Sequence, residues 1–178
     1  MGCSVLATHS GQRLGPKCEE GFAVQQTRMS RPGGLSLASG STSSKPAVRG
    51  LGEIALRVND LDAMQKFYED IIGLPLMRRD TNFAFFKVAD GYGGHTQVLA
   101  LFDRSQNPSY RGIDGATSTI DHIAFEISLA DYVSEKERLV ASGLRVITAE
   151  HDWIHWRSLY VNDPEGNEVE LVCYDPAL

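Results

Sequence analysis

Apolar residues follow two alternating patterns from residue 51 to the end of the chain. Short runs with the two-residue period of a β-strand are separated by two longer stretches with the 3.6-residue period of a helix. The first stretch predicts a helix over residues 61–71 that ends at Gly73, and the second predicts a helix over residues 128–140 that ends at Gly143. The apolar stripe of the second helix comprises Leu129, Tyr132, Val133, Leu139 and Val140. The predicted strands cover residues 51–58, 74–79, 82–88, 96–102, 119–127, 144–149, 156–161 and 168–174.

The order strand, helix and three further strands occurs twice, and the amino acids repeat with it. The aligned pairs are residues 51–58 with 120–127 at an offset of 69, Gly73 with Gly143 at an offset of 70, and residues 99–102 with 169–172 at an offset of 70. Three matches at nearly the same offset indicate an internal duplication. The sequence therefore predicts an α+β fold built from two tandem βαβββ modules.

The body of the chain, residues 50–178, differs in composition from residues 1–49. Within the body we expect module one over residues 50–103, a polar linker over 104–118 and module two over 119–175. The first 49 residues have no sustained apolar period, and residues 35–45 are mostly Ser, Gly, Ala and Thr. This composition predicts a disordered, low-complexity extension. Arginines spread among serines leave organelle targeting as an alternative role for it.

Charge and cysteine usage restrict the partners of the protein. The formal net charge is −6 and no stripe of Lys and Arg is present, which argues against nucleic acid as a partner. No apolar run approaches the roughly 20 residues of a membrane span, so no membrane partner is expected. Cys3, Cys18 and Cys173 have no paired spacing, which disfavours a disulfide framework and a structural zinc site. We therefore expect a cytoplasmic protein, with Cys173 as a small core residue.

Two segments of module two carry a family resemblance. Residues 121–125 read Asp-His-Ile-Ala-Phe, and residues 159–171 read Leu-Tyr-Val-Asn-Asp-Pro-Glu-Gly-Asn-Glu-Val-Glu-Leu. Together with the paired modules, they resemble the vicinal oxygen chelate superfamily, which includes glyoxalase I, bleomycin-resistance proteins, fosfomycin-resistance enzymes and extradiol ring-cleaving dioxygenases. The resemblance implies that the modules form a curled mixed sheet around a small-molecule cavity. It also implies that any metal ligands come from the first and last strands of each module.

Carrying these ligand positions onto the sequence gives three candidates. The first-strand positions are Glu53 and His122, which coincide in the repeat. The last-strand positions are Ala100 and Glu170 at the offset of 70, and Ala100 cannot bind a metal. A shift of register in that strand would bring Gln97 into the position instead. The resemblance therefore implies a metal site made of Glu53, His122 and Glu170.

A second match points to the extradiol dioxygenases within that superfamily. The spacing of His151, Tyr160, Asp163, Gly166 and Glu170 resembles their signature. In that family the His and the Tyr line the active site and the Glu binds iron, which implies catalytic roles for His151 and Tyr160. The sequence departs from the family because Glu53 stands where its first iron ligand is a His, and because the further catalytic His of module one is absent.

The chemistry of the candidate ligands favours a divalent cation. Two carboxylates that converge in a partly dry cavity repel each other, and each loses hydration. A cation, a captured proton or a water-filled pocket would relieve this. One nitrogen and two oxygen donors suit Fe²⁺ or Mn²⁺, with Zn²⁺ and Mg²⁺ as alternatives.

The leading hypothesis is therefore a metal-dependent enzyme of the glyoxalase or extradiol-dioxygenase type, a lyase, isomerase or dioxygenase acting on a small oxygenated metabolite. Trp156 and Arg157 are expected at the rim of its substrate pocket. The alternative is a metal-free protein that sequesters a small molecule, with Trp153, Trp156 and Tyr160 as the apolar walls. A third possibility is a paralogue with a structural or regulatory role. The resemblance also implies a homodimer.

Overall fold

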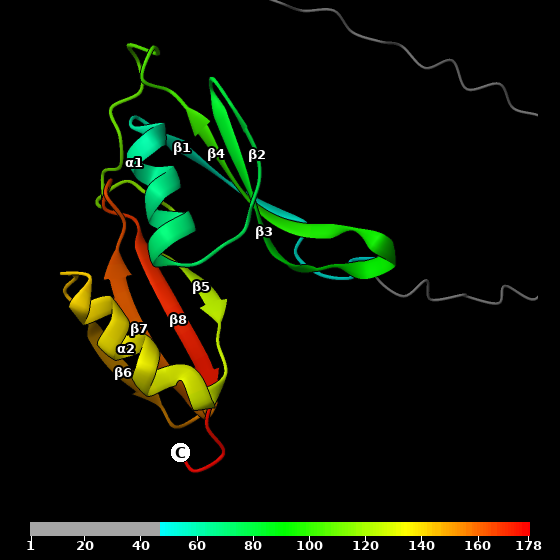
Figure 1. The fold of residues 1–178 in the computed structure, drawn as a ribbon, viewed down its shortest axis with the longest axis vertical. Helices are drawn as coiled ribbons and strands as arrows, with labels where there is room; N and C mark the ends of the chain where they lie inside the picture. Colours follow the sequence, from blue (N-terminus) through cyan, green and yellow to red (C-terminus); the bar gives the residue numbers. More distant parts are fainter. Residues whose placement is uncertain (1–46) are drawn as a thin grey trace, which may run out of the picture. The chain divides into compact units, whose positions relative to one another are not determined.

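The computed structural model describes residues 47–178 (Figure 1). The prediction of a disordered extension over residues 1–49 falls almost entirely outside the described residues, as do Cys3 and Cys18. Cys173 is 1% exposed, which confirms its place in the core. None of the helices within residues 47–178 combines the length and the apolar character that crossing a membrane requires.

Module one contains one helical segment and four strands. Its sheet has the order β1-β4-β3-β2, in which β1 and β4 are parallel and the other neighbours are antiparallel. Asp60 caps the helix, because its side chain accepts a hydrogen bond from the backbone N–H of Ala63. The elements are β1 (Glu53–Val58), α1 (Leu61–Lys66), the π-helical turn η1 (Phe67–Ile71), β2 (Leu76–Asp80), β3 (Phe83–Asp90), the 3₁₀ turn η2 (Tyr92–Gly94) and β4 (Thr96–Asp103).

Module two repeats this arrangement with the sheet order β5-β8-β7-β6. Its elements are β5 (His122–Glu126), the 3₁₀ turn η3 (Leu129–Asp131), α2 (Tyr132–Ala141), β6 (Ile147–His151), β7 (Trp156–Asn162) and β8 (Glu168–Tyr174). The two βαβββ modules predicted from the repeat are thus confirmed. They form two separate four-stranded mixed sheets, and neither sheet is closed into a barrel.

The strand registers confirm how the repeats align. In module one Ala55 pairs with Ala100 across the parallel strands, and in module two Ala124 pairs with Glu170. From module one to module two, the offset is 69 residues on the first strand (Ala55 to Ala124) and 70 on the last strand (Ala100 to Glu170), as the sequence predicted. Ala100 therefore occupies the position in module one that Glu170 occupies in module two.

Helix α2 covers one face of the second sheet (Figure 1). Tyr132 is half-buried and Leu139, two turns later, is fully buried, so these residues form the contact with the sheet.

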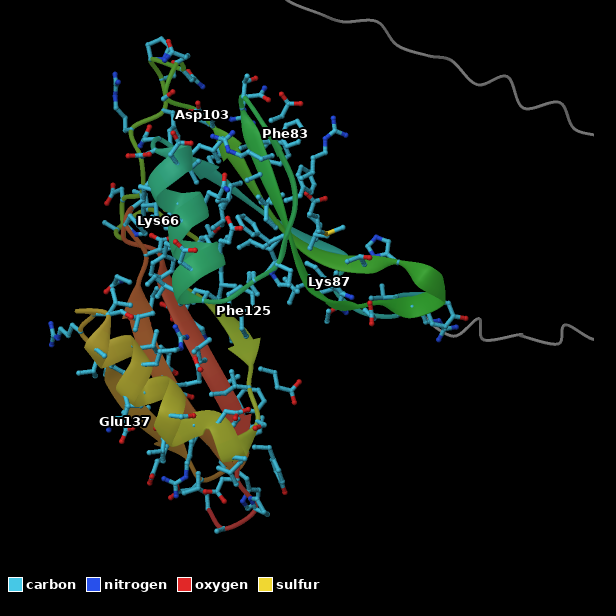
Figure 2. The ribbon with its side chains drawn as sticks, in the orientation of Figure 1. Lys66, Phe83, Lys87, Asp103, Phe125 and Glu137 are labelled. Carbon is cyan, nitrogen blue, oxygen red and sulfur yellow. The ribbon has the colours of Figure 1, made fainter. Side chains whose placement is uncertain are left out.

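The prediction that Leu129, Val133 and Val140 belong to the buried stripe is wrong, because they are 40%, 64% and 55% exposed. Val133 and Val140 each directly follow a residue that contacts the sheet, and one residue rotates a helix by about 100°, toward solvent here. Glu137 on the same helix is also exposed (Figure 2).

The turn between β7 and β8 joins the two modules. The Asp163 carboxylate accepts hydrogen bonds from the backbone N–H groups of Glu165 and Asn167, at 3.0 and 2.9 Å, which closes the turn. It also accepts a hydrogen bond of 3.0 Å from the hydroxyl of Tyr68, a fully buried residue of module one. Glu165 Oε1 accepts from the backbone N–H groups of Asn59 and Asp60 at 2.5 and 2.8 Å, just before α1 begins. Side chains of the turn therefore fix module two against the start of this helix.

The Tyr68 contact makes stability depend on pH. Burial, together with the adjacent Asp163 carboxylate, raises the pKa of Tyr68 far above its ordinary value of 10.0. At pH values above 10.0, the unfolded chain releases the phenolic proton of Tyr68, while the folded chain keeps it. The unfolded state then binds fewer protons, so the free energy of unfolding falls as pH rises.

We predict that Tyr68→Phe lowers the free energy of unfolding at neutral pH by about 1–3 kcal/mol, because the buried Asp163 loses one donor. As the pH rises above about 10, the free energy of unfolding should also fall less in the variant than in the wild type. Urea unfolding between about pH 8 and about pH 10.5 measures both effects. Tyr174→Phe, at a residue that is 57% exposed, is the matched control. An unchanged alkaline slope in Tyr68→Phe would contradict the assignment.

Candidate active site

The polar side chains of module two gather on the sheet face opposite α2. Paired residues on neighbouring strands point to the same side of a sheet, and residues alternate along each strand. Glu170 on the central strand β8 pairs with Tyr160 on β7 and with Ala124 on β5. His122 lies two residues before Ala124 on β5, and His151 lies four residues after the partner of Tyr160 on β6. Because side chains alternate along a strand, both histidines share this side. We call this side the open face of the second sheet.

Glu170 and His122 form the centre of the site. Glu170 is 3% exposed, and its Oε2 lies 3.0 Å from His122 Nε2. The other ring nitrogen, His122 Nδ1, lies 3.0 Å from Asp121 Oδ2. Ionised carboxylates only accept hydrogen bonds, so the protonated imidazole is the form that donates to both of them. In that form it balances the charge of the buried carboxylate.

Tyr160 and His151 extend the cluster from Glu170 toward the edge of the sheet. The Tyr160 hydroxyl donates to Glu170 Oε1 at 3.0 Å. Because that proton is committed, the same hydroxyl accepts from His151 Nε2 at 3.3 Å. The rings of His122 and Tyr160 meet edge to face, with centroids 5.9 Å apart. The open face thus carries one continuous hydrogen-bonded chain from His151 to Asp121.

Two pKa shifts follow from this arrangement. The hydrogen bond to Asp121 raises the pKa of His122 above its ordinary value, and the charge of Glu170 adds to the effect against partial burial. Burial raises the pKa of Tyr160, and the Glu170 carboxylate raises it further. At neutral pH, Tyr160 therefore keeps the proton that it donates to Glu170.

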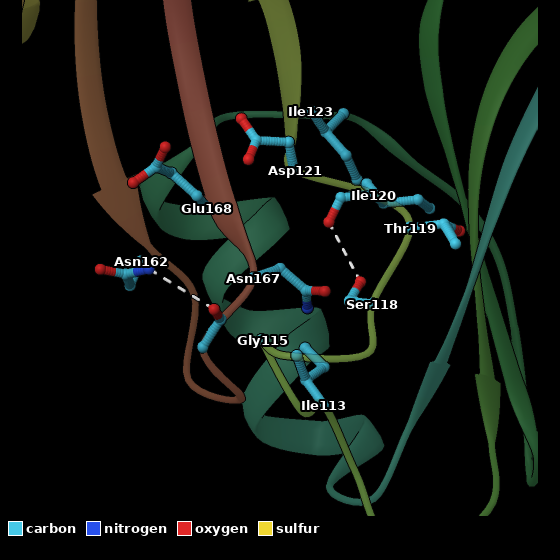
Figure 3. A pocket seen from close by; sticks show the side chains of 11 residues that line it. Ile113, Gly115, Ser118, Thr119, Ile120, Asp121, Ile123, Asn162, Asn167 and Glu168 are labelled. Carbon is cyan, nitrogen blue, oxygen red and sulfur yellow. Dashed lines mark hydrogen bonds between the residues drawn. The ribbon is translucent and has the colours of Figure 1, made fainter.

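A cavity of about 420 Å³ borders the cluster (Figure 3). Asp121 and Glu168 lie on its wall, and Asn162 and Asn167 line it nearby. Ligand atoms of Asp121, His122 and Glu168 lie within 4.8 Å of one another, a spacing that could hold a metal ion. The site therefore has three carboxylates around one imidazole, because Glu170 contacts the same ring.

Glu53 is exposed at the start of β1, in the first sheet. The group of Asp121, His122 and Glu168 does not include it, and residues 47–178 contain no group of at least three metal-binding side chains with Glu53 as a member. The structure thus brings His122, Glu170, Tyr160 and His151 together and leaves Glu53 apart from them. The role of Glu53 as a ligand stays a prediction.

The sequence profile of the Glyoxalase/Bleomycin resistance protein/Dioxygenase superfamily matches residues 50–171, both modules and the linker between them. The chain belongs to this superfamily.

Solved structures of the superfamily share the fold of this chain. A lactoylglutathione lyase from Agrobacterium tumefaciens is 26% identical, with a TM-score of 0.54, over 72% of this chain and 96% of that one. A glyoxalase/dioxygenase from Nostoc punctiforme is 22% identical, with a TM-score of 0.57, over 71% and 92% of the two chains. The fosfomycin resistance protein FosX from Listeria monocytogenes is 22% identical, with a TM-score of 0.53, over 73% and 97%. These likenesses support the fold of a superfamily member and leave its reaction open.

The two residues predicted for the pocket rim lie on opposite sides of the second sheet. Trp156 pairs with His151 and shares the open face, where it is 37% exposed. Arg157 points to the side covered by α2, and its guanidinium is paired with Glu150 and with Asp175, the latter at 2.5 Å. Arg157 is therefore not brought together with the cluster. Trp153, in the turn between β6 and β7, is 83% exposed.

Sequence reasoning missed two residues of this superfamily member's site. Asp121 and Glu168 enter the sequence analysis only as positions within the two family segments, residues 121–125 and 159–171. The parallel pairing of His122 with Glu168 brings these two side chains to one edge of the sheet. A signal was present, because Asp121 directly precedes a candidate ligand, but its contact with Nδ1 required coordinates.

We predict that His122 in the metal-free protein titrates above the ordinary histidine value of 6.5. Asp121→Asn should lower its pKa, because an amide cannot stabilise the imidazolium as a carboxylate does. Proton NMR of the His122 ring as a function of pH measures both values. Asp152→Asn, at an exposed carboxylate in another turn, is the control. If Asp121→Asn leaves the His122 midpoint unchanged, the contact with Asp121 does not determine it.

Proposed function

We propose that the chain is a metal-dependent enzyme of the glyoxalase or extradiol-dioxygenase type that acts on a small oxygenated metabolite. The observation that carries the proposal is the contact between His122 Nε2 and the buried carboxylate of Glu170, at 3.0 Å. Two members of the same open face, Tyr160 and His151, add a hydrogen-bonded acid–base pair next to it.

The donor atoms fit a divalent cation. His122 Nε2 and Glu170 Oε2 lie 3.0 Å apart, so one ion could be held by both. Glu168 and Asp121 add negative charge close to the same imidazole. An imidazole nitrogen with carboxylate oxygens suits Fe²⁺ or Mn²⁺, and also Zn²⁺ or Mg²⁺.

His122 and Glu170 are the residues that would hold the ion, and loading it requires the Nε2 proton of His122 to leave. When bound, such an ion polarises two adjacent oxygens of a chelated substrate and stabilises negative charge on them. The protein side of the reaction lies with Tyr160, whose raised pKa keeps the hydroxyl protonated beside Glu170. This hydroxyl can donate a hydrogen bond to a substrate oxygen that gains charge.

His151 completes this part of the site. Its Nε2 donates to the oxygen of Tyr160, so it orients the hydroxyl and can resupply its proton. Trp156 on the same face offers an apolar wall beside His151. These groups suit proton transfer on a small substrate bound over the open face.

We predict that His122→Ala and Glu170→Gln each weaken Mn²⁺ binding at least about tenfold, since each removes a donor atom. Isothermal titration calorimetry on protein purified without chelator provides the measurement. His95→Ala, which removes an exposed imidazole near η2, is the matched control and should bind as the wild type does.

The same titration separates the two leading functions. A wild-type protein that binds no divalent metal, or a His122→Ala variant with full affinity, contradicts the proposal. Either result favours a metal-free protein that sequesters a small molecule.

We further propose that the protein is a homodimer and that Glu53 meets His122 and Glu170 of the partner chain. Two observations support this. Glu53 is exposed and apart from the cluster within the described chain. Glu53 also lies two residues before Ala55, the partner of Ala100, so its side chain is on the same face as theirs. This face corresponds to the open face of the second sheet. An exposed carboxylate at that position is free to reach a site on a second copy.

Mixing two inactive variants tests this arrangement. Glu53→Gln and His122→Ala should each lower Mn²⁺ binding when prepared alone. After subunit exchange, each mixed dimer regains one complete site, so about a quarter of all sites recover. A site within one chain regains nothing on mixing, and sedimentation that shows only monomers would contradict the shared site directly.

A further inference from the structure

A second cavity, of about 720 Å³, lies between the linker and the first sheet. Arg57 of β1 and Phe102 of β4 line it from the sheet, and Tyr110, Arg111 and Asp114 line it from the linker. None of these residues takes part in the hydrogen-bonded chain of the candidate active site. The cavity therefore calls for an explanation of its own.

Three guanidinium groups line this cavity without a matching carboxylate. They belong to Arg57, Arg104 and Arg111. Within residues 47–178, none of the three forms an ion pair with Asp or Glu. Arg104 donates to the backbone carbonyl of Asp103 at 3.3 Å, and Arg111 donates to that of Pro108 at 2.5 Å. These carbonyls help to position the side chains of Arg104 and Arg111, and they are neutral acceptors.

The acidic residue on the cavity wall, Asp114, is engaged in its own turn. Its Oδ1 accepts from the backbone N–H of Ala116 at 3.0 Å, and its Oδ2 accepts from the hydroxyl of Thr117 at 3.1 Å. Three positive side chains against one negative side chain leave the lining with a net positive charge. This charge attracts an anion.

An aromatic wall lies next to the arginines. The Arg104 guanidinium lies 5.7 Å from the centroid of the Phe102 ring. The Phe102 ring in turn packs edge to face on Phe85, with centroids 5.8 Å apart, and the centroid of the Phe83 ring lies 6.4 Å away. The three phenylalanines share one face of the first sheet, because Phe102 pairs with Phe83 and Ala100 pairs with Phe85. A ligand here meets guanidinium groups and an apolar ring together.

The linker lies close to module one at two points. The Tyr110 hydroxyl donates to the backbone carbonyl of Arg57 at 2.6 Å. Gly112 has a φ of +81°, and a side chain there would approach Asn59 Nδ2 to 3.1 Å, so the linker passes close to module one at this point. The linker residue Tyr110 is therefore tied to the backbone that carries Arg57, so the two walls of the cavity are set against each other before a ligand binds.

We propose that this cavity binds a small organic anion, with its carboxylate or phosphate group at Arg57, Arg104 and Arg111 and its apolar part against Phe102. Arginine suits this role because its guanidinium matches both groups with paired hydrogen bonds. Ser118, Ile120 and Asn167 line both this cavity and the smaller one that borders Asp121 and Glu168. The binding of an anion here is independent of the proposed function. The further claim, that the anion is part of the substrate, rests on the proposed function.

The test is NMR of the arginine Nε–H groups in the metal-free protein, titrated with benzoate, benzyl alcohol and inorganic phosphate. Benzoate should shift the signals of all three arginines, and benzyl alcohol, which has the same ring without charge, should not. Phosphate should shift them with lower affinity, because it lacks the ring that contacts Phe102. Arg57→Gln and Arg111→Gln should each weaken benzoate binding about fivefold. Arg145→Gln, at an exposed arginine before β6, should leave it unchanged.

Absence of shifts at the three arginines, or equal weakening by Arg145→Gln, overturns the proposal. The variant His122→Ala separates it from the proposed function. Retained benzoate binding in a variant that has lost Mn²⁺ binding shows an anion site that is independent of the metal. If the wild type binds benzoate but no metal, the anion site stands and the metal-dependent function fails.

Discussion

The polar cluster on the second sheet depends on one buried carboxylate. Glu170 lies on the central strand of the second sheet and is almost fully withdrawn from solvent. A charge in that place is tolerated only with close partners. The strands on both sides provide them, because pairing aligns Tyr160 of β7 with Glu170 and places His122 of β5 diagonally across from it. The fold thus assembles an imidazole, a carboxylate and a phenol without any loop having to close over them.

The duplication produces two similar scaffolds with different chemistry. Ala100 stands in module one where Glu170 stands in module two, and Phe85 pairs with it where Tyr160 pairs with Glu170. Glu53 keeps the first-strand position that His122 holds in the second copy. One module therefore presents carboxylates, an imidazole and a phenol, and the other presents arginines beside phenylalanine rings. The proposed ligand, a small anionic metabolite, has groups that suit both.

The sequence predicted the scaffold better than it predicted the contacts. The repeat and the two-residue and 3.6-residue periods located every strand and both helices, because these patterns follow directly from burying one side of each element. The apolar stripe predicted for the second helix was wider than the face that is buried, since periodicity does not show how much of a short helix contacts the sheet. The contacts of Glu165 with Asn59 and Asp60 span more than 100 residues, and no local pattern encodes such a distance. Arg157 next to Trp156 looked like a pocket residue, but strand alternation points it to the other face.

The most direct test of the account is the location of a bound ion. Crystals grown with Mn²⁺ and without chelator allow the ion to be placed from its anomalous scattering. The account predicts a peak at coordination distance from both His122 Nε2 and Glu170, with Asp121 still bonded to Nδ1. A peak at Nδ1 between Asp121 and Glu168, or no peak on the open face of the second sheet, would contradict it.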